Sequence, residues 1–129
     1  FSSVTVWTRI SVKKVSTILD KMPYIHIHTN LNESVLKDGV EDRIAKVVAD
    51  TLGKPLEKMN VIIVTGIRLQ RFGSKEPAVT VTISSVGSFD AQRNPAYGPA
   101  IKQVFKEEFG VENDRCGIVY HDLKVNFFF

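Results

Sequence analysis

The sequence predicts an α/β fold, a two-layer sandwich in which two antiparallel helices cover a four-stranded sheet. Segments with the alternation or the β-branched content of strands are interspersed with segments that have the period of helices. The order strand, helix, strand occurs twice along the chain. With 129 residues, 43% of them hydrophobic, the chain has the size of one domain with its own core.

The first strand is predicted at residues 24–31, YIHIHTNL, where apolar and polar side chains alternate. Residues 1–22 differ in composition, because they contain four basic residues, one acidic residue and many Ser, Thr and Val. We interpret 1–22 as an N-terminal extension, either upstream sequence or a removable segment, and 23–129 as the domain. A basic, serine-rich segment is also typical of a transit peptide.

The first helix is predicted from apolar positions that share one helical face: Val40, Ile44, Val47, Val48, Thr51 and Leu52. Ser34 or Asp38 would cap its start, and Gly53 would end it before Pro55. The next segment, 60–65, reads NVIIVT. This nearly continuous β-branched run predicts a buried central strand.

The second half repeats this order. Residues 66–76 are predicted as a loop, and 78–86 alternate as a strand. Asp90 and Asn94 are cap candidates for the second helix and Pro95 suits its first turn, but Pro99 would cost about 3 kcal/mol inside a helix unless it lies at a kink or at a late start. The apolar face of this helix is clear from Ala100 onward. Gly110 ends it before the last strand around 118–120. A shift of 57 residues places Gly53 on Gly110, which indicates two β-α-β units.

Composition excludes several functional classes. The net charge of +3 comes from dispersed basic residues, so we expect no nucleic-acid partner. The single cysteine, Cys116, excludes an internal disulfide and a cysteine-rich zinc site, and we interpret it as a core residue. No apolar run approaches the roughly 20 residues of a membrane span, so we expect no membrane insertion. We expect a cytoplasmic protein that could also be secreted by a route without a signal peptide.

Three histidines could suggest a metal site. His26 and His28 share one face of the first strand, and His121 follows the last predicted strand. No third ligand is expected to converge on the pair, so we interpret all three as structural and predict no metal.

The junction of Met22 and Pro23 carries the strongest chemical signal. While Pro23 follows Met22, its nitrogen is a tertiary amide without a basic lone pair. If Met22 is an initiator that is removed, the same nitrogen becomes a secondary amine. A free α-amino group has a pKa near ~8, and a nearby cation or burial lowers that pKa toward neutrality. Such an amine can act as a general base.

Six short motifs, each weak alone, are specific for one protein family when they occur together. They are Met22-Pro23, Thr29-Asn30-Leu31, Gly53-Lys54-Pro55, Glu76-Pro77, Ile83-Ser84-Ser85-Val86-Gly87 and Asp114-Arg115. In this order and spacing, the chain from Pro23 to about Leu123 resembles the macrophage migration inhibitory factor family of the tautomerase superfamily. Ser84-Ser85, Asn60-Val61 and Lys58 make it more similar to the D-dopachrome tautomerase branch.

The resemblance implies a homotrimer and a keto-enol tautomerase that needs no cofactor. Pro23 would be the base for substrates such as phenylpyruvate or dopachrome, with D-dopachrome decarboxylation as a related activity. Lys54 and Lys58 would bind the carboxylate of the small aromatic keto acid. Ser85 and Val86 would line the pocket, the backbone amide of Val86 donating to that carboxylate.

The resemblance also implies a second class of function. The protein would be a cytokine-like ligand of a cell-surface receptor, and in the alternative hypothesis its tautomerase pocket is vestigial or blocked. Some positions depart from the family. Gly117 and Val119 stand where the cytokine-type branch supplies a tyrosine and an asparagine from the adjacent subunit, and the thiol pair of that branch is replaced by Ala78 and Val81. The terminal phenylalanines, 127–129, could replace part of the family's aromatic rim.

Overall fold

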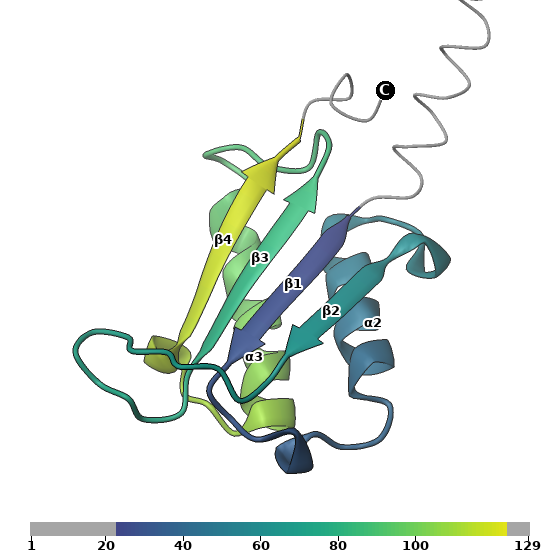
Figure 1. The fold of residues 1–129 in the computed structure, drawn as a ribbon. Coiled ribbons are helices and arrows are strands. Elements are labelled where there is room, and N and C mark those ends of the chain that lie inside the picture. The colour runs from purple at the N-terminus through teal and green to yellow at the C-terminus, as the bar shows by residue number, and fades with distance from the viewer. Residues whose placement is uncertain (1–22, 124–129) are drawn as a thin grey trace, which may run out of the picture.

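The computed structural model describes residues 23–123, so the predicted extension 1–22 and the phenylalanines 127–129 lie outside the described residues. One sheet carries both main helices on the same face (Figure 1). The strands are β1 (Tyr24–Thr29), β2 (Asn60–Val64), β3 (Val79–Ser85) and β4 (Cys116–Asp122), and the helices are α2 (Val40–Leu52) and α3 (Asn94–Phe109). Three short 3-10 helices complete the elements, η1 (Glu33–Val35), η2 (Leu56–Lys58) and η3 (Asn113–Arg115).

The sheet has the order β2-β1-β3-β4 and confirms the predicted fold class. β1 pairs in parallel with β2, β3 pairs in parallel with β4, and the two pairs join through antiparallel β1 and β3. Each parallel pair is connected through one helix, which must run back against its strands. Because the two pairs are antiparallel, α2 and α3 are antiparallel as well.

The internal repeat is confirmed at the level of single residues. A shift of 57 residues places η2 on η3 and Gly53 on Gly110. Both glycines end a helix in the left-handed conformation, with φ of 68° and 72°. Their N–H groups donate to the carbonyls of Ala49 and Lys106, as in the helix ends that favour glycine.

The core lies between the helices and one face of the sheet. Its largest fully buried side chains include Ile25, Ile27, Val81 and Ile83 from the sheet and Ile44, Val48, Ile101 and Phe105 from the helices. Burial of each such side chain stabilises the fold by about 1.5–3 kcal/mol. Cys116 is fully buried in the same cluster, as predicted. No helix of residues 23–123 is long and apolar enough to cross a membrane.

An ion pair ties the two helices together at the edge of this core. Arg43 on α2 donates to both carboxylate oxygens of Glu108 on α3, at 2.9 and 2.7 Å. The hydrogen bond from Arg43 lowers the pKa of the Glu108 carboxyl and outweighs the effect of its burial. The Arg43 side chain therefore binds both the carboxylate of Glu108 and the backbone carbonyl of Asp38.

Two of the motifs behind the family resemblance contact each other. The hydroxyl of Thr29 donates to the carbonyl of Ala78 at 2.7 Å, and the amide of Asn30 donates to the carbonyls of Lys75 and Glu76. Ala78 N–H in turn donates to Asn30 Oδ1 at 2.9 Å. The end of β1 thus holds the start of β3 through side chains, which explains why a threonine-asparagine pair and a glutamate-proline pair occur together.

The predicted start of the first helix is wrong, whereas the second helix begins close to one of its two predicted cap candidates. α2 begins after Gly39, which has a φ of 79° and offers no side-chain cap. Ser34 lies in η1, and the backbone carbonyl of Asp38 is used by Arg43. α3 begins at Asn94, has Pro95 in its first turn as predicted, and contains Pro99. Pro99 is the sixth residue of α3, so its missing N–H removes one intrahelical hydrogen bond in the second turn.

The predicted central strand is also wrong in position. The segment 60–64 forms β2 at one edge of the sheet, with β1 as its only strand neighbour among the described residues. Ile62 is 44% exposed, on the face that the helices leave open. The apolar run therefore does not mean that this segment is buried within a single chain.

Candidate functional site

Pro23 lies at the end of the sheet where β1 begins and β3 ends. It is buried, and its carbonyl accepts a hydrogen bond from the backbone N–H of Asn60 at 3.2 Å. The side-chain amide of Asn60 donates to the same carbonyl at 3.5 Å and to the carbonyl of Lys58 at 3.3 Å. Asn60 therefore fixes Pro23 against the segment that leads into β2.

The connection between α2 and β2 supplies both predicted lysines. Lys54 follows Gly53, and its backbone N–H donates to the carbonyl of Ala49 at 3.0 Å. Lys58 ends η2 and lines a hollow of about 240 Å³ together with Tyr24, Glu57, Met59 and Asn60. Among the described residues neither lysine forms an ion pair, and both are half-buried. Lys58 thus lies next to the Pro23 end of β1, with its ammonium free for an anion.

The end of β3 lies on the other side of β1. Tyr24 pairs with Ser84, so Ser85 and Val86 extend past the strand beside Pro23. Ser85 is fully buried, and its hydroxyl lies 2.9 Å from that of Ser88. Its predicted contact with substrate remains a prediction, since the structure engages this hydroxyl within the chain. Val86 is half-buried and precedes Gly87, whose φ is 70°.

Gly117 and Val119 lie away from this end of the chain's own sheet. Both belong to β4, the strand at the edge opposite β2, where Gly117 pairs with Thr80 and Val119 with Thr82. Val119 is 54% exposed. Within one chain they cannot complete the site at Pro23, so any contribution to such a site requires a second copy.

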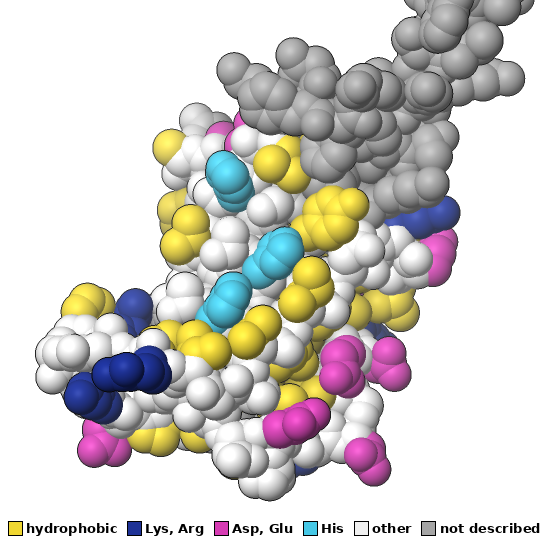
Figure 2. All heavy atoms as spheres, viewed as in Figure 1, with side chains coloured by type: hydrophobic (Ala, Val, Ile, Leu, Met, Phe, Trp, Pro, Cys, Tyr) yellow, Lys and Arg dark blue, Asp and Glu magenta, His cyan; other side chains and the backbone are white. Residues whose placement is uncertain are grey.

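The three histidines lie on the open face of the sheet. Figure 2 views that face and shows two histidines next to each other and the third apart from them, with apolar side chains nearby. His26 pairs across the strands with Ile62 and Thr82, and His121 pairs with Ser84. Within residues 23–123 no group of three histidines, cysteines or carboxylates is arranged to hold a metal ion.

The sequence of this chain matches a known protein family. The family model described as macrophage migration inhibitory factor matches residues 22–127. The chain belongs to the macrophage migration inhibitory factor family. This result confirms the family resemblance, and the match spans β1 through β4.

Two relatives illustrate the similarity in sequence. The MIF-like protein mif-2 of Caenorhabditis elegans is 35% identical over 103 residues, which cover 79% of this chain and 85% of that protein. The D-dopachrome decarboxylase of Gallus gallus is 30% identical over 104 residues, or 80% of this chain and 88% of that protein. The name of the second relative agrees with the predicted branch and with the predicted enzyme class.

Solved structures show the same fold. The macrophage migration inhibitory factor of Trichinella spiralis superposes with a TM-score of 0.75 at 23% identity, over 78% of this chain and 89% of that one. The homologue from Oncomelania hupensis gives a TM-score of 0.74 at 24% identity, over 79% of this chain and 74% of that one. This chain therefore shares its fold with these two proteins.

Sequence reasoning missed two residues that shape this surface. Asn60 was recognised only as a marker of the branch, although it holds the Pro23 carbonyl. Arg71 was assigned to a polar loop, although its guanidinium lies against Gly117 of β4. A glycine inside an edge strand was the available signal, because such a glycine often marks the close approach of another group.

Proposed function

We propose that this chain, once Pro23 is its first residue, is a keto-enol tautomerase of small aromatic keto acids that needs no cofactor. Phenylpyruvate and dopachrome are the substrate types. The single observation that carries the proposal is the position of Pro23, buried at the start of β1 with its carbonyl held by Asn60 and with Lys58 beside it. Family membership supports the same activity.

The reaction needs one group that accepts and returns a proton. The free amine of Pro23 takes the enol O–H proton, the C–O double bond forms, and the proton is delivered to the neighbouring carbon. The reverse sequence converts the keto form to the enol. A general base in such a position contributes roughly 10²–10⁴-fold to the rate.

The neighbouring cations would bind the substrate and tune the base. The ammonium groups of Lys54 and Lys58 attract the substrate carboxylate, and the backbone N–H of Val86 adds a neutral donor. A cation close to an amine disfavours the protonated form, which lowers the amine's pKa. The same lysines thus orient the acid and keep Pro23 ready to accept a proton near neutral pH.

The second candidate function is a cytokine-like trimer that binds a cell-surface receptor with its tautomerase pocket blocked. Two observations favour it. Gly117 and Val119 cannot offer polar side chains to a neighbouring subunit, and the hydroxyl of Ser85 is engaged by Ser88. The amide bond to Met22, where it is retained, removes the base altogether.

A tautomerase assay on two forms separates these functions. The full chain and a chain that begins at Pro23 are compared by following the ultraviolet absorbance of enol-phenylpyruvate. We expect the form that begins at Pro23 to be at least about 100-fold faster, because only it has a basic nitrogen. N-terminal sequencing of the native protein identifies which form exists in cells.

Substitutions in the form that begins at Pro23 test the individual roles. Pro23→Gly keeps an amine but loses the ring, and we expect a lower kcat. Lys54→Ala and Lys58→Ala should raise KM, whereas Lys46→Ala, on the exposed side of α2, is the matched control. Equal rates for the two forms and all variants would exclude Pro23 as the base and would favour the receptor-binding function.

A further inference from the structure

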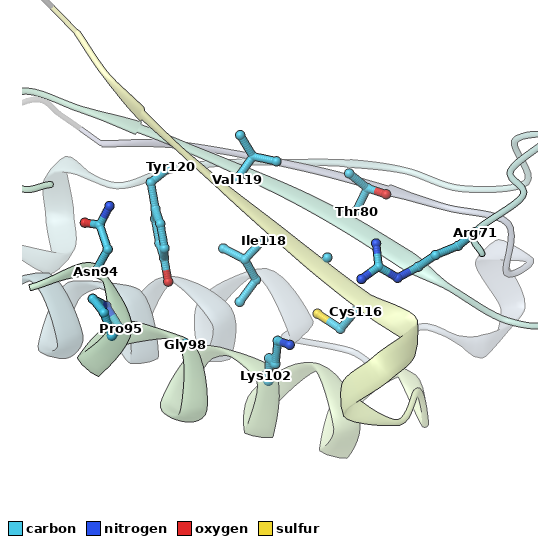
Figure 3. A pocket seen from close by; sticks show the side chains of 11 residues that line it. Arg71, Thr80, Asn94, Pro95, Gly98, Lys102, Cys116, Ile118, Val119 and Tyr120 are labelled. Atoms are coloured by element: carbon cyan, nitrogen blue, oxygen red, sulfur yellow. The ribbon is translucent and has the colours of Figure 1, made fainter. Parts of the chain in front are cut away.

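The open face of the sheet carries no permanent charge. Along β1 the even-numbered residues point away from the core, and their register partners in β2, β3 and β4 share this face. None of these residues is Lys, Arg, Asp or Glu, although 24% of the chain is charged. Figure 3 shows the alternation along β4, where Val119 points away from α3 while Ile118 and Tyr120 point toward it. Because no lysine, arginine or carboxylate would be desolvated, this face can be covered at low cost.

All three histidines of the chain lie on this face. His26 and His28 belong to β1, and His121 belongs to β4. His26 is half-buried between Ile62 of β2 and Thr82 of β3, whereas His28 and His121 are exposed. Histidine is the side chain whose charge ordinarily changes between roughly pH 5 and pH 8. The face is therefore uncharged above that range and gains positive charge below it.

The neighbours of His26 and His28 do not offset such a charge. β2 places Ile62 and Val64 beside them, and β3 places threonines. The ring of Tyr24 lies 6.4 Å from that of His26, and a phenol is neutral at these pH values. Among the described residues, no carboxylate shares the face with this pair.

The charged groups at the β4 end of the face have the wrong sign or orientation. A Cβ atom built on Gly117 would lie 2.5 Å from Arg71 Nη1, so this guanidinium covers the face in the row of His28. Asp122 follows His121, but it alternates to the opposite face, and its carboxylate accepts a backbone N–H at 3.3 Å. Protonated histidines would therefore share the face with another cation.

The margins of the open face carry opposite charges, which favours a second copy of this chain as its partner. Figure 2 shows Lys and Arg side chains gathered at one margin and several Asp and Glu side chains at the other. A hollow of about 510 Å³ beside β2 is lined by Glu41, Asp42 and Glu57. A hollow of about 410 Å³ in the loop before β3 is lined by Arg68 and Lys75. Within residues 23–123 none of these side chains forms an ion pair, so the acidic margin of one copy can receive the basic margin of another.

We propose that copies of this chain associate through the open face and that the protonation of its histidines controls this association. With neutral imidazoles, Ile62, Val64 and Val119 are covered without burial of an unpaired charge. With imidazolium groups, the same contact desolvates positive charges and brings those of different copies together, which opposes association. The control requires neither a free Pro23 nor a substrate, so it is independent of the tautomerase activity.

Sedimentation equilibrium of the full chain at two pH values and one ionic strength tests the proposal. We expect an assembly at pH ~8 and mainly single chains at pH ~5.5, because each histidine that must be neutral weakens association about tenfold per chain over this interval. Return to the higher pH should restore the assembly. The far-ultraviolet circular dichroism should be the same at both pH values, which separates dissociation from unfolding.

Substitutions of the histidines identify the groups responsible. A variant that combines His26→Asn, His28→Asn and His121→Asn has no imidazole, so its mass should be that of the assembly at both pH values. His26→Lys carries a charge at both pH values and should weaken association at pH ~8 at least about tenfold. Val35→Lys is the matched control, because Val35 is exposed but lies in η1 outside the sheet, and it should leave the mass unchanged.

Three results would overturn the proposal. Single chains at pH ~8 would show that the open face is not an interface between copies. An equal mass of the unsubstituted protein at the two pH values would show that protonation does not control association. A pH dependence that persists in the triple asparagine variant would assign the control to other groups. A failed tautomerase assay would change none of these results, since no measurement uses a substrate.

Discussion

The hydroxyl of Thr29 is a small group on which two segments depend. It is fully buried, donates to Ala78 and accepts from the N–H of Leu31 at 3.2 Å. Thr29→Val keeps the shape and leaves both backbone groups without that partner. We expect the free energy of unfolding to fall by about 1–3 kcal/mol, the cost of unsatisfied buried groups. Urea denaturation at one fixed protein concentration measures the change.

Thr51 offers a matched control for this substitution. It lies on α2, is half-buried, and its hydroxyl has no recorded partner among the described residues. Thr51→Val should change the free energy of unfolding by less than about 0.5 kcal/mol. An equal loss in the two variants would mean that the hydroxyl of Thr29 has no special role.

For single residues, the sequence predicts chemical properties better than it predicts tertiary contacts. The nitrogen of Pro23 can be judged from its covalent neighbours alone, so its potential as a base was visible without a fold. The relation of Arg71 to Gly117 was not visible, since it depends on a loop folding back onto β4. The role of Lys58 could be predicted only in part, because its position beside Pro23 follows from the pairing of Tyr24 with Asn60.

Two glycines, one within α3 and one at its end, test how backbone conformation affects stability. Gly98 lies inside the helix and Gly110 ends it, with a φ of 72°. A Cβ would meet no atom within 4 Å at either position. Gly98→Ala should raise the free energy of unfolding by about 1 kcal/mol through helix propensity. Gly110→Ala should lower it by about 1–2 kcal/mol through left-handed strain.

Urea denaturation of both variants decides this prediction. Because steric space is the same, opposite signs would isolate backbone conformation as the cause. Changes of the same sign would show that the helix end does not depend on the conformation of Gly110.

The same distinction explains which elements the sequence predicted. Helix ends were correct because a left-handed glycine is a local requirement. The start of α2 was wrong because this helix begins after Gly39, and Arg43 in its first turn is positioned by Glu108 from the other half of the chain. The order of elements could be predicted from periodicity alone, whereas the start of α2 depends on tertiary contacts.

The whole molecule has one covered and one open sheet face. α2 and α3 cover one side, and Figure 2 shows apolar side chains and histidines on the other. The exposed large apolar residues include Ile62, Val64 and Val119. β2 and β4 also leave two sheet edges unpaired within the described chain. Exposed apolar faces and open edges favour association.

This asymmetry accounts for the strand that the sequence placed at the centre of the sheet. A β-branched run such as residues 60–64 is typical of a strand that is buried. In one chain the run lies at an edge, with Ile62 in the open. We therefore expect copies of this chain to cover it, in line with the homotrimer that the family resemblance implies.

Ile62→Asp tests this assembly directly. A carboxylate in a covered apolar face lacks a partner, and its desolvation opposes association. We expect light scattering after size-exclusion chromatography to give three chains for the unsubstituted protein and one chain for the variant. Val35→Asp is the matched control, since Val35 is similarly exposed but lies in η1 outside the sheet. A single chain in the unsubstituted protein would contradict the trimer, and an unchanged mass for Ile62→Asp would move the interface away from this face.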